Sequence, residues 1–243
     1  MHAAAGAARG RARALERGLS VLLEKPPGVT VAEAESLAAL AHARGASLFA
    51  SWHSRYGAAV EPARAWLATR RILGGRVAWK EDVRVWHPGQ AWIWKEGGLG
   101  VFDPGINALS ILTLLAPAGL GVENAELRYP GNCGAPSAAK VRLHAAGGGT
   151  IDMELDFLQT GPPTWSIALD TDRGRLLLSR GGRELELDGR SIEVAPASEY
   201  AALYAHFAAL LRRGASDVDL RPFALVAEVF ARGKRLEGPP FHE

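Results

Sequence analysis

The stretch Leu22–Pro27 (Leu-Leu-Glu-Lys-Pro-Pro) constrains the fold of this chain more than any other. An apolar run ends there in a glutamate and Lys25, two prolines follow, and a helix-capping sequence begins at Thr30. A parallel strand delivers polar side chains in this way to the carboxyl edge of a doubly wound sheet, where ligands bind. The sequence therefore predicts a strand over residues 19–23, a ligand-facing lysine and a helix that ends at Gly45.

The first 55 residues follow the order helix, strand, helix, strand, and the outer two elements are expected over residues 3–17 and 47–52. This order is typical of a parallel sheet with crossover helices, although the segment is too short for a whole doubly wound domain. Further along, the pattern predicts a long strand over residues 76–86, repeated short strands from 123 to 194, and helices over 60–70, 106–115, 199–213 and 220–232, of which the last two close the chain. The expected fold is a partial parallel α/β unit followed by an α+β domain with one large, mostly antiparallel open sheet packed on helices.

A hairpin over residues 140–157 alternates charged and apolar residues. Folding about Gly147–Gly149 places the charged residues opposite one another on one face, in the pairs Lys140–Asp156, Arg142–Glu154 and His144–Asp152. The apolar residues then share the other face. The dipeptide Asp188-Gly189 predicts a second hairpin with a two-residue turn.

Composition excludes several classes of protein. The 243 residues are 48% hydrophobic, enough for a sizeable core, and a net charge of +2 gives no reason to expect nucleic acid or a membrane as partner. Cys133 is the single cysteine, and zinc, Walker and serine-hydrolase motifs are absent, so no disulfide framework and no metal are expected. The arginines near the amino terminus suit either a transit peptide or an exposed helix face, and a cytoplasmic location is the expectation.

Lys25, Asp103 and Asn107 are the first candidates for chemistry. A lysine at the end of a buried strand either forms an ion pair or donates to a substrate hydroxyl and relays its proton. Asp103 and Asn107 share a face of an apolar helix because they lie four residues apart. Asp103 is either only a helix cap or, together with Asn107, a ligand for a polyol from which it accepts a proton.

His53 follows the second predicted strand, and Lys25 follows the first, so both side chains are expected at the same edge of the sheet. A histidine in this position is either structural or functional. Tryptophan faces suit the C–H surfaces of sugars, and they also fill ordinary cores. The further candidates are Glu81, Trp86 and Trp165.

In their order and spacing, these motifs resemble the glucose–fructose oxidoreductase/inositol dehydrogenase (Gfo/Idh/MocA) family of NAD(P)-dependent sugar dehydrogenases. Glu24-Lys25-Pro26 looks like the family's E-K-P motif beside the nicotinamide. Asp103-Pro104-Gly105-Ile106-Asn107 looks like its D-x-G-x-H helix, with asparagine in place of histidine. That replacement, together with Trp-His-Ser-Arg-Tyr at residues 52–56, is similar to the L-arabinose/D-galactose 1-dehydrogenase subgroup.

The resemblance implies oxidation of an aldose at C1 to its lactone, with NADP or NAD as cofactor. It implies that Lys25, Asp103 and Asn107 are catalytic, and that Glu24 and Lys25 contact the cofactor. It implies that the sugar is bound by His53, Glu81, Trp86 and Trp165. A homo-oligomer formed through the open sheet is also expected.

The chain departs from the family at its front, because no G-x-G-x-x-G fingerprint occurs in it. We therefore expect residues 1–54 to be the remnant of a Rossmann-type dinucleotide-binding domain and residues 55–243 to be a substrate-binding and oligomerisation domain. On this interpretation the chain alone is an inactive fragment of an active parent. The alternative is a non-catalytic sugar-binding or oligomerisation module without its own cofactor domain.

Overall fold

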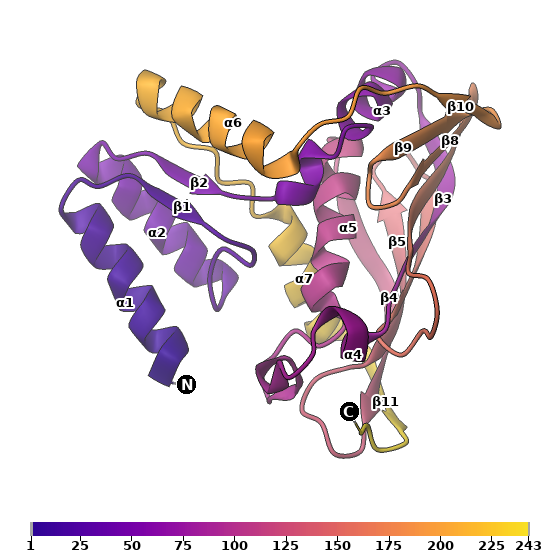
Figure 1. The fold of residues 1–243 in the computed structure, drawn as a ribbon, viewed down its shortest axis with the longest axis horizontal. Helices are drawn as coiled ribbons and strands as arrows, with labels where there is room; N and C mark the ends of the chain where they lie inside the picture. Colours follow the sequence, from indigo (N-terminus) through magenta and orange to yellow (C-terminus); the bar gives the residue numbers. More distant parts are fainter. Residues whose placement is uncertain (1, 243) are drawn as a thin grey trace.

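The computed structural model describes the backbone of residues 2–242 and the side chains of residues 9–242. Two lobes meet at a central group of helices (Figure 1). The first lobe contains α1 (His2–Glu16), β1 (Val21–Leu23), α2 (Val31–Arg44) and β2 (Leu48–Ala50), and its two strands pair in parallel. The predicted order of helix, strand, helix and strand is therefore confirmed.

The short parallel sheet is covered on both of its faces. Helices α1 and α2 lie on one face and α6 (Glu199–Arg213) lies on the other (Figure 1). Leu15 and Leu37 pack against the first face, and Leu203 packs with Phe49 at the second. The backbone of Asp217 also pairs with Phe49, so the chain returns beside β2 near its carboxyl end. A helix from the last fifth of the sequence thus contributes to the layer that begins with α1.

Local sequence signals fix the path of the chain after β1. The Thr30 hydroxyl accepts the N–H of Glu33 at 3.1 Å, and the Glu33 carboxylate accepts the N–H of Val29 at 2.8 Å. Gly45 ends α2 with a φ of 63°, a left-handed conformation that favours glycine. Because α2 is capped as predicted, the segment that carries Lys25 must turn between β1 and this helix.

The second lobe is built on a nine-stranded sheet in the order β10-β9-β8-β7-β3-β6-β5-β4-β11. Neighbouring strands run antiparallel except for the pairs β3–β6 and β4–β11. The predicted large, mostly antiparallel sheet is therefore confirmed. The strands are β3 (Ile72–Lys80), β4 (Leu120–Pro130), β5 (Ala138–Ala145), β6 (Thr150–Asp156), β7 (Thr164–Thr171), β8 (Gly174–Ser179), β9 (Glu184–Leu187), β10 (Arg190–Ile192) and β11 (Lys234–Gly238).

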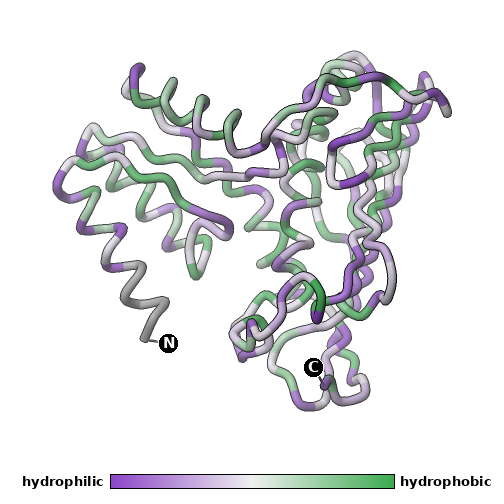
Figure 2. The backbone as a smooth tube through the Cα atoms, in the orientation of Figure 1, coloured by the Kyte–Doolittle hydropathy of each residue, from purple (hydrophilic) through white to green (hydrophobic). Residues whose placement is uncertain are grey.

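Three helices cover one face of this sheet: α3 (Val60–Leu67), α5 (Phe102–Leu115) and α7 (Arg221–Arg232). Figure 2 shows hydrophobic stretches along the helices that lie against the sheet. α5 is buried almost all round because it lies between the sheet and the other two helices, which explains its apolar sequence. Among residues 2–242, no helix has the length and apolar character that a membrane crossing requires.

The strand predicted over residues 76–86 is wrong at both ends. β3 starts at Ile72, since pairing with β6 and β7 on its two sides outweighs the low strand propensity of Gly74 and Gly75. It stops at Lys80 because the Asp82 carboxylate accepts the N–H of Arg84 at 3.0 Å and caps the one-turn helix α4 (Val83–Trp86).

The predicted register of the first hairpin is also wrong, by two residues. The observed pairs are Lys140–Glu154, Arg142–Asp152 and His144–Thr150. The N–H of Ala145 donates to the carbonyl of Gly149 at 2.8 Å, and Gly148 has a φ of 92°, so a three-residue loop turns the chain one residue earlier than predicted. A shift of two leaves each side chain on its predicted face, and the predicted apolar face is indeed buried.

The two predicted closing helices are not the last elements, because β11 follows α7 and pairs in parallel with the edge strand β4. Its sequence, Lys-Arg-Leu-Glu-Gly, is too short and too charged to indicate a strand by pattern. The edge of β4, which only the tertiary structure supplies, makes it one. The helix predicted over residues 199–213 is confirmed as α6, which Ser198 caps and Gly214 ends, and Asp188-Gly189 forms the predicted two-residue turn between β9 and β10. α3 ends at Leu67 and α5 begins at Phe102, so the predicted bounds of these two helices are wrong at one end each.

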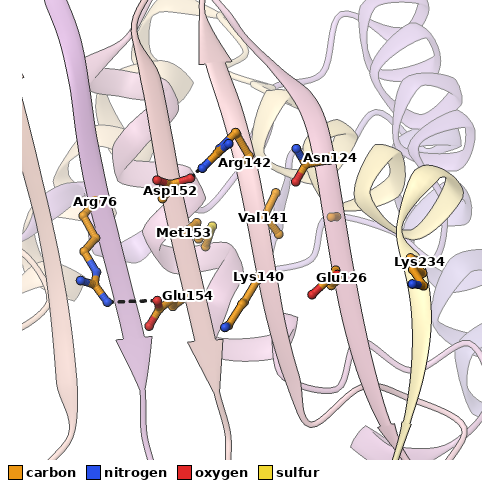
Figure 3. Close-up of a pocket in the computed structure, with 11 residues that line it drawn as sticks. Arg76, Asn124, Glu126, Lys140, Val141, Arg142, Asp152, Met153, Glu154 and Lys234 are labelled. Carbon is orange, nitrogen blue, oxygen red and sulfur yellow. Dashed lines mark hydrogen bonds and ion pairs between the residues drawn. The ribbon is translucent and has the colours of Figure 1, made fainter.

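The face of the sheet opposite the helices carries rows of alternating charge (Figure 3). Glu126, Lys140 and Glu154 are register neighbours on β4, β5 and β6. Glu154 accepts from Arg76 at 3.0 Å, and the Arg142–Asp152 pair on the next row is 2.8 Å apart. These side chains, together with the apolar Val141 and Met153, line a shallow groove of about 580 Å³.

Candidate functional site

A pocket of about 280 Å³ lies where the two lobes meet, at the carboxyl ends of β1 and β2. The first lobe contributes Lys25, after β1, and His53, in the 3₁₀ turn η1 (His53–Tyr56) after β2. The second lobe contributes Asn107 from α5, Trp165 from β7 and the turn between β8 and β9. Six of the predicted site residues therefore line one pocket: Lys25, His53, Glu81, Trp86, Asn107 and Trp165.

Lys25 and Asp103 form a buried ion pair beside this pocket, of which Lys25 lines the wall and Asp103 does not. The Lys25 ammonium lies 3.0 Å from Oδ2 of Asp103 and donates to the Asp103 backbone carbonyl at 2.8 Å. The Asp103 side chain is 5% exposed, so its charge needs this partner. Val101 holds the N-cap position of α5, and the Asp103 carboxylate bonds to Lys25. Of the two interpretations of Asp103, a simple helix cap is thus excluded.

Asn107 lies one turn along α5 from Asp103 and faces the same pocket. Its backbone carbonyl accepts from the Ser110 hydroxyl at 2.7 Å. Its side-chain amide makes no hydrogen bond to any of residues 9–242 and is free to bind a ligand that both donates and accepts.

Glu81 lines the pocket but is almost fully buried, with 3% of its surface exposed. Its Oε1 accepts from Nε2 of His87 at 2.9 Å, and its Oε2 accepts from the indole N–H of Trp165 at 2.8 Å. Trp86 meets Trp165 edge to face at 4.7 Å between ring centroids. Glu81 thus holds two other members of the pocket wall in place.

His53 belongs to a second histidine–carboxylate pair. Its Nδ1 lies 3.1 Å from Oε2 of Glu199, at the start of α6, and its ring stacks on Tyr200 at 5.6 Å. Arg183 donates to Oε1 of the same carboxylate at 3.1 Å. Burial raises the pKa of Glu199, but the hydrogen bonds from His53 and Arg183 outweigh that effect and leave the pKa below its usual value.

Sequence reasoning missed His87, Arg183 and Glu199. Glu199 had a detectable signal, since it is an acid in the first turn of the helix predicted over residues 199–213. His87 lies six residues after Glu81, and no periodicity indicates that the two side chains meet. The turn of α4 brings them together, because the N–H of His87 donates to the Val83 carbonyl at 2.8 Å.

The turn after β1 does not fit the pyrophosphate of a dinucleotide. Such a group binds free backbone N–H groups at the start of a helix. At α2 the N–H groups of Val29 and Glu33 already bond to the helix's own capping residues, and the Glu33 carboxylate repels an anion. Two prolines, which lack an N–H, occupy the preceding turn. Glu24 is exposed and does not line the pocket, so its contact with a cofactor stays a prediction.

Known proteins resemble the chain over nearly its whole length, although no protein-family model matches it. Galactose 1-dehydrogenase from Pseudomonas fluorescens is 46% identical over 231 residues, which are 95% of this chain and 75% of that protein. The D-galactose-1-dehydrogenase structure from Rhizobium etli superposes with a TM-score of 0.93 at 49% identity, over 97% of this chain and 75% of that one. The structure of KijD10, a 3-ketoreductase from Actinomadura kijaniata solved with NADP and TDP-benzene, superposes with a TM-score of 0.81 at 21% identity, over 96% of this chain and 76% of that one. At this level of identity the similarity establishes a shared fold only.

A parallel α/β layer joined to a large open sheet, with a polar pocket at the carboxyl ends of the parallel strands, defines an oxidoreductase fold of the two-domain type. The chain belongs to the Gfo/Idh/MocA family. Its relatives at 46% and 49% identity are galactose 1-dehydrogenases, so it is related to enzymes that oxidise an aldose.

Proposed function

We propose that this chain holds an aldopyranose in the pocket between its lobes, for oxidation at C1 to the lactone with NADP or NAD as hydride acceptor. The observation that carries the proposal is the Lys25–Asp103 ion pair beside a pocket walled by tryptophans and polar side chains. The kinship with galactose 1-dehydrogenases supports D-galactose or L-arabinose as substrate, because these sugars share most of their ring stereochemistry. A volume of about 280 Å³ is at the small end for ligand sites and suits a monosaccharide.

Each residue has a role that follows from its chemistry. Asp103 accepts the proton of the C1 hydroxyl, and Lys25 donates a hydrogen bond to that hydroxyl while its charge stabilises the carboxylate. The Asn107 amide, which is free, binds a neighbouring hydroxyl, and His53 binds another. Trp86 and Trp165 present ring faces to the C–H surface of the sugar.

Among the described residues, the start of α2 is already capped by its own side chains and does not favour binding of a dinucleotide phosphate. We infer that residues 1–243 alone bind the sugar but have no dehydrogenase activity, and that Glu24 and Lys25 reach only the nicotinamide end of a cofactor. Activity then depends on a dinucleotide-binding part with a glycine fingerprint.

A chimera tests the proposal, made by joining residues 1–243 to the quarter of the Rhizobium etli chain that the match leaves uncovered. In this background, Asp103→Ala and Lys25→Ala are expected to lower kcat far more than they raise KM, since both groups act on the reacting hydroxyl. Asp170→Ala, on an exposed strand position, is the control and should leave both constants unchanged. A near-normal kcat for either site variant would remove that residue from the chemistry. Sugar binding without activity in an otherwise folded chimera would favour the non-catalytic module.

We also propose that the open face of the sheet joins two copies of the chain. Its rows of alternating charge, such as Glu126, Lys140 and Glu154, are self-complementary when a two-fold axis brings two such faces together (Figure 3). The competing interpretation is a solvated face, which antiparallel sheets often have.

A further inference from the structure

The carboxylates in and beside the pocket are already bonded to protein donors. Asp103 is bound to Lys25, Glu199 to His53 and Arg183, and Glu81 to His87 and Trp165. A neutral sugar offers hydroxyl donors that need acceptors within the pocket. A pyranose has several hydroxyls, so a further acceptor in the pocket wall would contribute to binding it.

His87 meets this description. It lines the pocket, and the centroid of its ring lies 5.5 Å from that of Phe157. Because the Glu81 carboxylate can only accept, the 2.9 Å contact requires the proton of the neutral imidazole to be on Nε2. The other nitrogen, Nδ1, then carries a lone pair, and it makes no hydrogen bond to any of residues 9–242.

Glu81 has a reason to be buried at this point. A carboxylate that is 3% exposed costs free energy unless both of its oxygens are bonded, and here one oxygen is held by His87 and the other by Trp165. The same carboxylate thus sets the tautomer of one pocket residue and the ring orientation of another. Replacing it by an amide of the same shape would reverse the tautomer without removing the bond to Trp165.

We propose that His87 is a sugar-binding residue whose Nδ1 accepts a hydrogen bond from a ring hydroxyl, and that Glu81 is the positioning residue that fixes its tautomer. This inference rests on the proposed function, because it assumes a sugar in the pocket. It reassigns Glu81, which the sequence placed directly on the substrate, to a role exerted through His87 and Trp165.

The first test is spectroscopic and needs no activity. At about pH 8, where an ordinary imidazole is neutral, ¹⁵N NMR of the histidine rings should show His87 protonated on Nε2 in the wild-type chain. In Glu81→Gln the side-chain amide donates to Nε2, so the proton should move to Nδ1. A wild-type ring protonated on Nδ1 would overturn the proposal.

The second test is D-galactose binding, followed by the fluorescence of the pocket tryptophans. His87→Phe keeps a ring against Phe157 and removes both nitrogens, and we expect the Kd to rise about tenfold. His42→Phe, on the exposed surface of α2, is the matched control and should leave the Kd unchanged. Far-UV circular dichroism and thermal unfolding establish that each variant is folded.

A series of monodeoxy galactoses identifies the hydroxyl concerned. For the wild type, one deoxy sugar should bind about tenfold more weakly than galactose. For His87→Phe, the same deoxy sugar and galactose should bind with equal affinity. If galactose binds the wild type, but removing each hydroxyl changes the Kd by the same factor in the wild type and in His87→Phe, the assignment of His87 is wrong while the proposed function stands. If no aldose binds the wild type at all, both fail.

Discussion

Asp219 should contribute more to the stability of this protein than any exposed ion pair. Its Oδ2 accepts from Arg55 and from Arg221, both at 2.6 Å, and its Oδ1 accepts the side-chain and backbone N–H groups of Arg221. Arg55 also donates to the Ser110 carbonyl at 2.8 Å, so this cluster ties η1, which carries His53, to α5 and α7. We call Asp219, Arg55 and Arg221 the Asp219 cluster.

The expected cost of Asp219→Asn follows from burial. The Asp219 and Arg55 side chains are 14% and 12% exposed, so removing the carboxylate charge leaves the Arg55 guanidinium largely desolvated and without a counter-charge. Breaking a buried pair in this way costs about 3–5 kcal/mol. The residual exposure and the remaining amide oxygen place the expected value at the lower end, about 3 kcal/mol.

The effect should depend on pH with a defined sign. Burial raises the pKa of Asp219, but Arg221 and Arg55 outweigh burial and hold that pKa far below its ordinary value of 3.8. The stabilisation is therefore fully present above the pKa of the unfolded chain, about 4, and is lost as the pH falls towards the folded-state pKa. The difference between the wild type and Asp219→Asn should be constant near neutral pH and shrink below about pH 4.

Urea unfolding at several pH values measures this difference. Tryptophan fluorescence is a suitable signal, because the indole N–H of Trp52 donates to the Asp219 carbonyl at 2.8 Å. Asp170→Asn breaks an exposed pair with Arg175 and should change the free energy of unfolding by less than about 1 kcal/mol. A loss below about 1 kcal/mol for Asp219→Asn, or a loss unchanged at low pH, would refute the reasoning.

Three further predictions concern packing, cofactor and assembly. Gly105→Ala should destabilise the chain by about 1–3 kcal/mol in urea unfolding, because a Cβ there would lie 2.6 Å from Cδ1 of the buried Leu155. An unchanged unfolding midpoint would mean that Leu155 moves away from α5 without cost and would contradict this prediction. Nicotinamide fluorescence titration of residues 1–243 should show no saturable NADPH binding below about 10 μM, and tighter binding would mean that the phosphate site is built from residues assigned here to other roles. Light scattering at micromolar concentration should give a dimer or larger oligomer that Lys140→Glu weakens, whereas a folded wild-type monomer would reject the open-face contact.

The sequence alone determined several local elements and predicted that polar side chains gather at one edge of the parallel sheet. Thr30 and Gly45 bound α2, Ser198 caps α6, and Asp188-Gly189 turns a hairpin, because each signal acts within a few residues along the chain. Lys25 and Asn107 were recognisable because a strand end and a one-turn helical spacing place polar groups in predictable positions. That the two line one pocket agrees with the expected sheet edge.

Only the tertiary structure decided which distant groups meet. β11 is a strand because the edge of β4 is available to it, and β3 begins at Ile72 because two neighbours pair with it. The two interpretations of Asp103, a helix cap and a site residue, could be distinguished only by the contact with Lys25, which lies 78 residues away in the sequence. Glu81 was expected to bind substrate, yet His87 and Trp165 occupy both of its oxygens. Periodicity and capping report on neighbours in the chain, whereas the partners of a buried charge are set by long-range packing that excludes water.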